Sequence, residues 1–530
     1  MGAGIWPFGV CRARGVPATP SNGQPRLRQP VFRKLLVANR GEVALRIFAA
    51  CRSLQVGTVA VYSDADATAP HVRAADEAVR LGPSPPRESY LRIDALIAAA
   101  QRTGAQAIHP GYGFLSENPA FATACDKAGI TFVGPPPTAM AVLGDKVALR
   151  TLALELGVPV CAGSPGVVPN VDAAAAVGAE VGYPLMLKAA KGGGGLGMRL
   201  VRSPAELPGA FASATTQAQA AFGDGSLFVE RYLQHPRHIE VQLLADSHGT
   251  VLALGERECS IQRRHQKILE EGPAPSLGAT ERAAVHQQAV RLAQAGGYVN
   301  AGTVEFLFEG GAFFLNEMNT RLQVEHPVTE MVTGIDIVGQ QLRIAAGERL
   351  QLRPSDIVVR GHAIECRINA EDPLHDFRPA PGPVRRYVEP QGEGIRVDSG
   401  ITAGWSVPAH YDSLVAKVIV VGADRPAAIA RMRQALESLV IEGFPTTVEV
   451  HRALLQDPAF VRGELSTRFL EERPVLAAVQ QALQLQRDAS ETDAAVLAAA
   501  LAMGSAGGLG PLHHRHTMPR RLPVEVRRWS

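Results

Sequence analysis

A Gly-Gly pair at residues 310–311 separates two segments rich in β-forming residues, and this arrangement is the strongest constraint on how the chain folds. The two segments are Thr-Val-Glu-Phe-Leu-Phe-Glu (303–309) and Ala-Phe-Phe-Leu-Asn-Glu-Met-Asn (312–319). Two such segments joined by a short glycine turn predict an antiparallel β-hairpin. The turn places Glu305 opposite, or nearly opposite, Glu317. Because like charges that face each other destabilise a sheet, we expect a divalent cation between the two carboxylates.

The residues that follow carry polar groups that suit a binding site better than a core. Glu-Met-Asn-Thr-Arg-Leu-Gln-Val-Glu-His-Pro occupies 317–327, and alternate side chains of an extended backbone project from one face. That face would carry Glu317, Asn319, Arg321, Gln323 and Glu325. We expect these groups to hold a metal-bound phosphate beside a small anion; the alternative is a solvated edge strand. Oxygen ligands favour Mg²⁺ or Mn²⁺ over Zn²⁺, and no Cys or His flanks the carboxylates at zinc-ligand spacing.

The N-terminal part of the chain alternates strand and helix patterns. Residues 33–62 read as a strand, a turn, an amphipathic helix and a second strand. This alternation predicts a doubly wound parallel sheet over residues 31–145. Ligands bind such sheets beyond the carboxyl ends of the strands, so we expect the Gly- and Pro-rich segment 107–118 to form a pocket wall. Within it, Tyr112 either lines the pocket or packs inside the turn.

A glycine loop follows the first domain. Four consecutive glycines, 192–195, and Gly197 lie between two strand patterns, with Lys188 at the end of the first strand. No helix pattern follows, which excludes the P-loop motif. Glycine amides can surround phosphate oxygens, and a lysine can neutralise them. We therefore expect residues 146–235 to form linker helices and a mobile lid that excludes water from a reactive phosphate; the alternative is a flexible hairpin without a ligand.

Two further segments are candidates for ligand contacts. Glu230 precedes an apolar segment that includes Leu233, a weak signal for a pair of contacts to adenine. The charged run at 256–267 lies in a region, 236–475, that reads as an α+β domain. Beside a phosphate-and-metal hairpin this run is expected to line the site, and the alternative is a solvated strand face.

Composition narrows the class of protein. A chain of 530 residues should hold several domains. Its formal net charge of +2 indicates neither a nucleic-acid partner nor a membrane surface. No apolar run reaches the roughly 18–20 residues that cross a bilayer. The six cysteines are scattered without a CxxC pair, which favours reduced thiols and a cytoplasmic location.

The two ends differ from the rest of the chain. Residues 1–30 contain four arginines, five prolines and no acid. We expect a disordered leader there; the alternative is a transit peptide and a mitochondrial matrix location. Residues 476–530 are expected to form an Ala-rich helix followed by a flexible basic tail.

Taken in order, six motifs of the chain resemble those of biotin carboxylases, which are enzymes of the ATP-grasp superfamily. The motifs occupy residues 37–42, 109–118, 191–199, 256–267, 317–327 and 365–372. The resemblance extends over about residues 31–475. It implies a mixed α/β and α+β protein with the ATP-grasp fold, built from a parallel-sheet N-terminal domain, a glycine-rich lid and a C-terminal α+β domain.

The resemblance also implies a role for each matching residue. ATP would be bound by Lys146, Lys188, Gly193, Gly194, Gly195, Glu230, Arg231, Leu233, His238, Gln262 and His265. Mg²⁺ or Mn²⁺ would be bound by Glu305, Glu317 and Asn319. Bicarbonate and biotin would be bound by Lys267, Arg321, Gln323, Val324, Arg367 and Tyr112. The catalytic residues would be Lys267, Arg321, Glu325 as the general base, and Arg367 at the biotin ureido oxygen.

Neighbouring charge and burial would act on Glu325 in opposite directions. Arg321 should lower the pKa of this carboxyl and burial should raise it, and the sequence leaves the balance open.

The implied reaction is ATP-driven formation of carboxyphosphate from bicarbonate, followed by carboxylation of biotin. It is the first half-reaction of acetyl-CoA carboxylase in fatty acid synthesis. The chain has no Ala-Met-Lys-Met biotinylation site, so we expect a separate biotin carboxyl carrier protein, separate carboxyltransferase subunits, and a homodimer. The alternatives are a subunit of a split propionyl- or methylcrotonyl-CoA carboxylase, another ATP-grasp carboxylate-amine ligase, or a non-catalytic scaffold. Leu196 stands where the family loop usually carries Lys or Arg, which predicts weaker ATP affinity.

Overall fold

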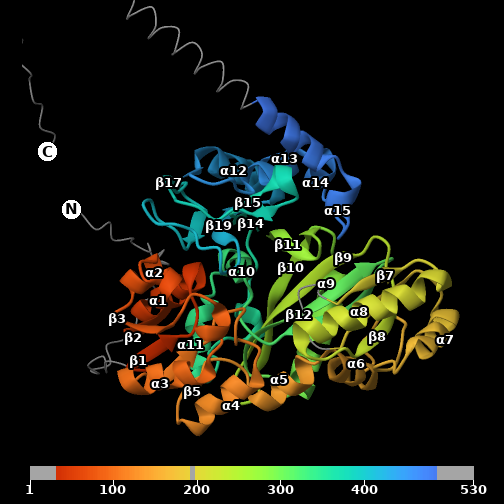
Figure 1. Ribbon diagram of the computed structural model, residues 1–530, viewed down its shortest axis with the longest axis horizontal. Coiled ribbons are helices and arrows are strands. Elements are labelled where there is room, and N and C mark those ends of the chain that lie inside the picture. Colours follow the sequence, from red (N-terminus) through yellow and green to blue (C-terminus); the bar gives the residue numbers. More distant parts are fainter. Residues whose placement is uncertain (1–30, 191–196, 486–530) are drawn as a thin grey trace, which may run out of the picture.

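The structure of the protein is a computed structural model, and it describes residues 31–190 and 197–485 (Figure 1). Its N-terminal lobe contains a five-stranded sheet in the order β3-β2-β1-β4-β5, in which every pair is parallel. The strands are β1 (Lys34–Val37), β2 (Gly57–Ser63), β3 (Glu77–Gly82), β4 (Ala107–His109) and β5 (Thr131–Phe132). The main helices are α1 (Gly41–Ser53), α2 (Pro70–Ala74), α3 (Ile93–Thr103) and α4 (Pro119–Lys127). The predicted doubly wound sheet is therefore confirmed.

The central strands β1 and β4 are buried along most of their length because helices cover both faces of the sheet. Leu35 and Val37 of β1 pack in one buried cluster with Ile47 of α1. Leu36, which projects to the other face, packs in a second cluster with Leu96 of α3. The turn after β1 thus leaves the sheet at its carboxyl edge, where a ligand site is expected.

Linker helices and a small sheet form the lid lobe. The linker helices are α5 (Pro137–Leu143) and α6 (Lys146–Glu155). Strands β6 (Leu185–Ala189), β7 (Arg199–Val201) and β8 (Leu227–Arg231) pair antiparallel in the order β7-β6-β8, with α7 (Val171–Val181) and α8 (Leu207–Phe222) beside them. The predicted pair of strands around the glycine loop is confirmed. Gly193, Gly194, Gly195 and Leu196 lie outside the described residues.

An eight-stranded antiparallel sheet runs through the rest of the molecule in the order β13-β12-β9-β10-β11-β14-β19-β18. These strands are β9 (Arg237–Ala245), β10 (Val251–Arg263), β11 (Gln266–Gly272), β12 (Asn300–Glu309), β13 (Ala312–Asn319), β14 (His362–Asn369), β18 (Ile395–Ser399) and β19 (Leu414–Gly422). The helices between them are α9 (Ala279–Ala295), α10 (His326–Thr333) and α11 (Ile337–Ala345). The sheet brings together all strands that carry predicted metal and bicarbonate residues.

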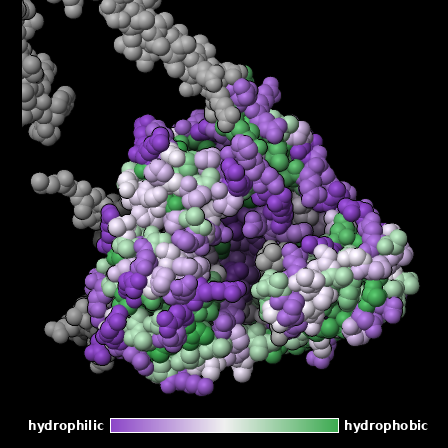
Figure 2. All heavy atoms as spheres, viewed as in Figure 1, coloured by the Kyte–Doolittle hydropathy of each residue, from purple (hydrophilic) through white to green (hydrophobic). Residues whose placement is uncertain are grey.

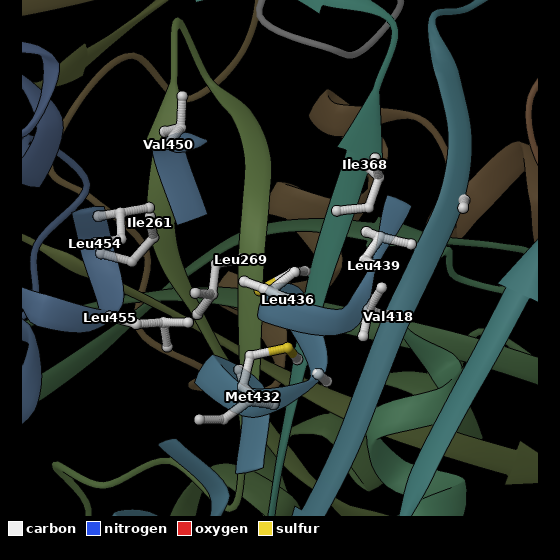
Figure 3. Close-up of a cluster of buried hydrophobic side chains, with 14 of the residues drawn as sticks. Ile261, Leu269, Ile368, Val418, Met432, Leu436, Leu439, Val450, Leu454 and Leu455 are labelled. Carbon is white, nitrogen blue, oxygen red and sulfur yellow. The ribbon is translucent and has the colours of Figure 1, made fainter. Parts of the chain in front are cut away.

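The C-terminal layer covers one face of this sheet with apolar side chains (Figure 3). It contains α12 (Arg425–Ser438), α13 (Val448–Gln456), α14 (Pro458–Arg462) and α15 (Phe469–Glu472), with the short strand pairs β15 (Glu371–Asp372) and β16 (Arg378–Pro379), and β17 (Arg386–Val388) and β20 (Val440–Glu442). On β14, Ile364, Cys366 and Ile368 enter this core. Because strand side chains alternate, Glu365 and Arg367 project to the opposite face.

Residues near the ends of the chain are only partly described. Residues 475–485 are helical, as predicted for the start of the Ala-rich segment, and 1–30 and 486–530 lie outside the described residues. Within the described ranges, no helix has both the length and the apolar character needed to cross a membrane.

Candidate active site

A cavity of about 1140 Å³ lies where the N-terminal lobe, the lid and the central sheet meet. Figure 2 shows a hollow at the centre of the molecule, with hydrophilic side chains gathered around it. Among the described residues, the following predicted site residues line the cavity: Tyr112, Lys146, Lys188, Glu230, Arg231, Leu233, His238, Gln262, His265, Lys267, Glu305, Glu317, Asn319, Arg321, Gln323, Val324 and Arg367. The predicted base Glu325 is fully buried and lies behind the wall, where it contacts Lys267 and Arg367.

The β12–β13 hairpin carries the candidate metal site. Glu305 and Glu317 are cross-strand partners, as predicted from the glycine turn, and the register shifts only after this pair. Glu305 Oε1 accepts hydrogen bonds from Asn319 Nδ2 at 2.8 Å and from Gln323 Nε2 at 3.1 Å. Glu317 Oε2 lies 2.9 Å from Lys146 Nζ. Side-chain cations therefore offset the repulsion between the two carboxylates.

Glu305 is kept ionised by its neighbours. Burial alone would raise the pKa of this carboxyl, but Lys267 and His238 outweigh it and hold the pKa well below its ordinary value. An ionised Glu305 beside Glu317 and the Asn319 amide offers hard oxygen donors at close range. This donor set fits Mg²⁺ or Mn²⁺.

His238, an expected ATP contact, approaches the metal hairpin in space although it is distant from it in the sequence. His238 on β9 has its Nε2 atom 2.9 Å from Glu305 Oε2. One ligand atom each from His238, Glu240 and Glu305 lie within 4.8 Å of one another. The reason is sheet order, since β9 pairs with β12 on the side away from β13. Glu240 is the Cα partner of Glu305 in that pairing. It was not identified from the sequence, although it lies two residues after His238 on the same face of β9.

The segment 317–327 is not extended throughout, so this prediction is wrong beyond Asn319. Strand β13 ends at Asn319 and α10 begins at His326. One cause is Glu117, whose carboxylate accepts hydrogen bonds from the Thr320 backbone N–H and from Arg321 Nε, both at 3.1 Å. The other is the proline at the first turn of α10, a position that proline favours. The turn nevertheless keeps Arg321 on the cavity wall, where it donates to Asn319 Oδ1 at 2.6 Å.

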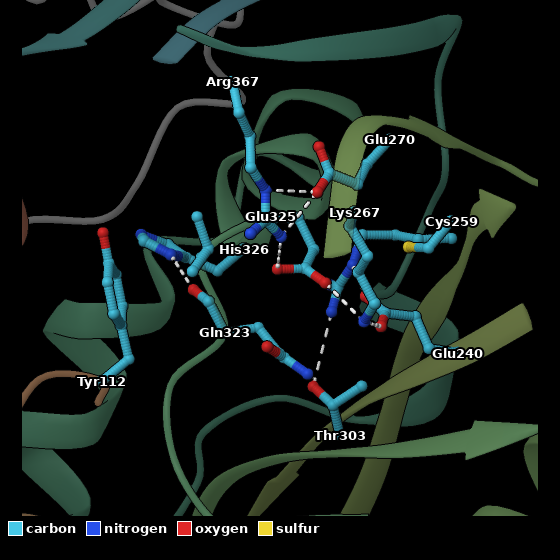
Figure 4. A network of polar contacts seen from close by, with 12 residues as sticks. Tyr112, Glu240, Cys259, Lys267, Glu270, Thr303, Gln323, Glu325, His326 and Arg367 are labelled. Atoms are coloured by element: carbon cyan, nitrogen blue, oxygen red, sulfur yellow. Dashed lines mark hydrogen bonds and ion pairs between the residues drawn. The ribbon is translucent and has the colours of Figure 1, made fainter. Parts of the chain in front are cut away.

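Glu325 is held between two cations (Figure 4). Lys267 Nζ donates to Glu325 Oε1 at 2.8 Å, and Arg367 Nη2 donates to Oε2 at 3.0 Å. Burial would raise the pKa of Glu325, but Lys267, Arg367 and Arg257 together hold it well below its ordinary value. The balance left open by the sequence is thus settled in favour of the cations. Arg321, named from the sequence as the lowering charge, is not among the principal causes.

Lys267 connects the metal hairpin to the anion pocket. Besides Glu325, its ammonium contacts Glu240 Oε2 at 2.5 Å and Glu305 Oε1 at 2.8 Å. Burial would lower the pKa of this lysine, but the three carboxylates raise it well above the ordinary value. Lys267 therefore remains charged, but each of its three N–H donors is directed at a carboxylate, so an anion that enters the cavity beside it must displace one of them.

The lid side of the cavity contains a second group of charges. Glu230 at the end of β8 lies 2.6 Å from Lys188 Nζ and accepts a hydrogen bond from Arg150 Nη1 at 2.8 Å. Arg150 was not identified from the sequence. Its only local signal is its position four residues after Lys146, which places both on the same side of α6. Of the remaining predicted contacts, Gln262 Nε2 lies 3.0 Å from His238 Nδ1, and Arg231, Leu233 and His265 lie on the wall.

Tyr112 combines both sequence interpretations. It lines the cavity and its hydroxyl donates to the Glu42 carboxylate. Glu42 in turn lies 3.2 Å from Lys417 Nζ, which donates to the Val324 carbonyl at 2.7 Å. A buried chain of polar groups therefore joins the N-terminal lobe to the turn that carries Glu325.

Three family models match successive parts of the chain. They describe the biotin carboxylase N-terminal domain at 31–140, the ATP-binding domain of the carbamoyl-phosphate synthase L chain at 145–353, and the biotin carboxylase C-terminal domain at 365–472. Together they span the predicted range of resemblance.

Similar proteins are found among curated sequences and solved structures. The biotin carboxylases of Nostoc sp. and Pseudomonas aeruginosa are each 51% identical, over 83% and 84% of this chain and 99% of theirs. A pyruvate carboxylase subunit of Methanothermobacter thermautotrophicus is 50% identical over 83% of this chain and 90% of its own. The structure of a biotin carboxylase–βγ-ATP complex from Campylobacter jejuni has a TM-score of 0.82 at 45% identity, covering 83% of this chain and 99% of that one.

A second solved structure has the same degree of similarity. The biotin carboxylase domain dimer of Hydrogenobacter thermophilus 2-oxoglutarate carboxylase, in complex with MgADP, ADP and bicarbonate, has a TM-score of 0.82 at 45% identity, covering 84% of this chain and 98% of that one. With the matching motifs, fold and site geometry, these similarities show that the chain belongs to the biotin carboxylase family and is an ATP-dependent ligase.

Proposed function

We propose that this biotin carboxylase makes carboxyphosphate from ATP and bicarbonate, carboxylates biotin on a separate carrier protein, and serves an acetyl-CoA carboxylase in fatty acid synthesis. The observation that carries the proposal is the meeting of two features on one cavity wall. One is the Glu305–Glu317 pair of the β12–β13 hairpin. The other is the cationic pocket formed by Lys267, Arg321 and Arg367.

Phosphoryl transfer requires chiefly positioning and neutralisation of charge. Lys146 and Lys188 line the cavity and already contact carboxylates there, so each can exchange such a partner for a phosphate oxygen. Glu305, Glu317 and Asn319 would hold Mg²⁺ or Mn²⁺. When bound, the cation would supply charge neutralisation to the ATP phosphates.

Bicarbonate is a small planar anion, and a guanidinium matches it with two parallel N–H donors in a way that an ammonium cannot. Arg321 is proposed to bind it bidentately by giving up the hydrogen bonds that Nη1 and Nη2 make to Gln323 and Asn319, with Lys267 supplying a second positive charge. Glu325 then accepts the proton of the bicarbonate hydroxyl. The oxygen freed of its proton bonds to the terminal phosphorus of ATP while the bond from that phosphorus to the ADP oxygen breaks.

Arg367 is proposed to act in the second half of the reaction. Its guanidinium lines the cavity and donates to Glu325, so it can carry negative charge that develops on the ureido oxygen of biotin. Its contact with Glu325 keeps it beside the base, and it is one of the cations that lower the pKa of that carboxyl.

The partners are proposed from the family. A homodimer is supported by the relative from Hydrogenobacter thermophilus, whose solved structure is described as a dimer. We also propose that the carrier protein and the carboxyltransferase are separate subunits and that the protein is cytoplasmic. Buried free cysteines at five positions, Cys51, Cys125, Cys161, Cys259 and Cys366, support a reducing compartment. Service to a pyruvate carboxylase is a second candidate, favoured by the relative from Methanothermobacter thermautotrophicus.

The function is tested with purified protein, Mg²⁺, ATP and free biotin. We expect ATP cleavage to require bicarbonate and to rise with biotin, and carboxybiotin to form. ATP cleavage that ignores bicarbonate would contradict the proposal. The acceptor is tested by adding biotinylated carrier and transferase from acetyl-CoA and pyruvate carboxylases in parallel. Formation of malonyl-CoA would support service to an acetyl-CoA carboxylase. Formation of oxaloacetate alone would instead support service to a pyruvate carboxylase.

A further inference from the structure

Glu270 lies behind Arg367, in a part of the molecule that the proposed mechanism does not use. It is on β11, is fully buried and is not one of the residues that line the cavity. Arg367 Nε donates to Glu270 Oε1 at 2.6 Å, while Nη2 of the same guanidinium donates to Glu325 Oε2 at 3.0 Å (Figure 4). A planar group that is held at two edges has a fixed orientation, so the two carboxylates leave Nη1 to a ligand in the cavity.

Glu365 lies beside Glu270 on the next strand. The two are Cα partners in the β11–β14 pairing, and both side chains are fully buried. Within the described part of the chain, neither oxygen of Glu365 nor Oε2 of Glu270 has a hydrogen-bond partner. Two carboxylates that face each other in a dry sheet cannot both ionise cheaply. The geometry alone thus indicates that this pair holds a proton.

The surrounding charges determine which carboxyl holds that proton. The pair is faced by Arg367 on β14, Lys267 on β11, Glu325 at the start of α10 and Lys417 on β19. Burial and the charge of Glu270 raise the pKa of Glu365 well above its ordinary value, against Lys417 and Arg367. Burial and the charge of Glu325 raise the pKa of Glu270 to about 7, against Arg367 and Lys267. Glu365 is therefore neutral near neutral pH, and Glu270 is the carboxyl that titrates.

We propose that Glu270 is a positioning residue whose carboxylate holds the Arg367 guanidinium in the orientation that the biotin half-reaction uses. The inference rests on the proposed function, because that function assigns Arg367 to the ureido oxygen. When Glu365 is neutral, Glu270 is the ionised carboxylate of this pair that contacts Arg367. An ionised Glu365 would compete with Glu325 for the same guanidinium.

The test compares two activities of the same enzyme, biotin carboxylation and the bicarbonate-dependent ATP cleavage that occurs without biotin. Their ratio cancels effects of nucleotide binding and of bicarbonate ionisation. Glu270→Gln should lower the ratio roughly 10- to 100-fold, the range that a displacement of about 1 Å at a reacting group costs. An equal loss of both activities, or a ratio within about 2-fold of wild type, would overturn the proposal.

The pH dependence of the ratio separates positioning from mere space-filling. The charged form of Glu270 holds Arg367, so in the wild type the ratio should rise from about pH 6 to about pH 8, as Glu270 ionises. In Glu270→Gln this rise should be absent. Glu270→Asp keeps the charge, so it should retain the rise with a smaller loss; it also serves if the Gln variant does not fold. A rise that persists unchanged in Glu270→Gln contradicts the proposal.

A double-mutant cycle tests whether Glu270 acts through Arg367. In an Arg367→Ala background, adding Glu270→Gln should leave the ratio unchanged in single-turnover measurements, because the guanidinium that Glu270 holds is already gone. A further, additive loss would show that Glu270 acts elsewhere. Glu365→Gln mimics the neutral carboxyl, so its ratio should stay within about 3-fold of wild type; a greater loss contradicts a neutral Glu365.

Failure of this inference differs from failure of the proposed function. If the wild-type enzyme forms no carboxybiotin, the function itself is wrong and the assignment of Arg367 falls with it. If the wild type is active, the variants alone decide the role of Glu270.

Discussion

Glu325 shows how the surroundings of one residue determine its chemistry. Burial alone would raise the pKa of its carboxyl, yet Lys267 and Arg367 hold it well below the ordinary value. The group is therefore ionised before substrate arrives and can accept a proton. A carboxylate with so low a pKa is a weak base, so its strength depends on whether its two cations stay in place. Residues that hold those cations thus affect catalysis without contacting substrate.

Replacing Glu325 with Gln tests its role as the base. Glu325→Gln keeps the size of the side chain but cannot accept the bicarbonate proton, so carboxylation should fall by about 10²- to 10⁴-fold, as expected for loss of a general base. Nucleotide affinity, measured by fluorescence titration with a labelled ADP, should change little. The same substitution at Glu464, which is exposed and pairs with Arg462, is the control. If nucleotide affinity falls as far as carboxylation, Glu325 is structural.

At the scale of elements, a helix, strand or turn could be predicted from the local sequence where residues close together in the chain determine its structure. The Gly310–Gly311 turn was sufficient to predict that Glu305 faces Glu317. It was not sufficient to predict where β13 ends, because Glu117 holds the following turn from about 200 positions away. The N-terminal parallel sheet could also be predicted from neighbours along the chain, because strand patterns and helix patterns alternate there.

Residues missed from the sequence share one property: their partners are remote in the chain. Arg150 contacts Glu230 at a separation of 80 residues, and Glu270 contacts Arg367 at a separation of 97. No local pattern announces such pairs. The first pair joins a linker helix to the lid sheet and the second joins two neighbouring strands of the central sheet, so each forms only through the packing of elements distant in the chain.

The hairpin predicts a metal requirement that can be measured. Removal of divalent cations by a chelator should abolish bicarbonate-dependent ATP cleavage, and Mg²⁺ or Mn²⁺ should restore it. Glu317→Gln removes one anionic oxygen ligand, so the Mg²⁺ concentration that gives half-maximal activity should rise by about 10-fold or more, as for loss of roughly 1.4 kcal/mol of binding. The exposed Glu442→Gln provides a matched control. An unchanged Mg²⁺ requirement in Glu317→Gln would exclude Glu317 as a ligand.

At the scale of the whole molecule, buried ion pairs join the lobes around the cavity. Glu330 on α10 lies 2.8 Å from Arg46 of α1 and 2.7 Å from Arg396 of β18. This one carboxylate links the N-terminal lobe to the far edge of the central sheet. Burial would raise its pKa, but Arg46 and Arg396 hold it well below the ordinary value of 4.5. The junction thus depends on Glu330 being ionised.

This junction predicts how stability depends on pH. A carboxyl whose pKa is lowered on folding stabilises the protein above its unfolded pKa, and the contribution is lost as pH falls below about 4.5 toward the folded value. Glu330→Gln removes one carboxylate partner from each of two half-buried arginines, which keep Asp336 and Asp398, and should cost up to about 3 kcal/mol at pH 7. The difference in unfolding free energy between the wild type and Glu330→Gln, measured by urea unfolding, should become smaller below about pH 4.5. For Glu442→Gln, an exposed pair, the cost should be under about 1 kcal/mol; equal costs would contradict the assignment.

Lysine is scarce in this chain, and its placement has a practical consequence. Only seven lysines occur in 530 residues. Three of them, Lys146, Lys188 and Lys267, line the cavity, and Lys417 is fully buried behind it. Of the other described lysines, Lys127 is exposed and Lys34 is partly so. Because Lys188 and Lys267 are held as ammonium ions by neighbouring carboxylates, an amine-directed acylating reagent would react first at the exposed Lys127 among the described lysines, and a probe attached there would leave the catalytic centre unmodified.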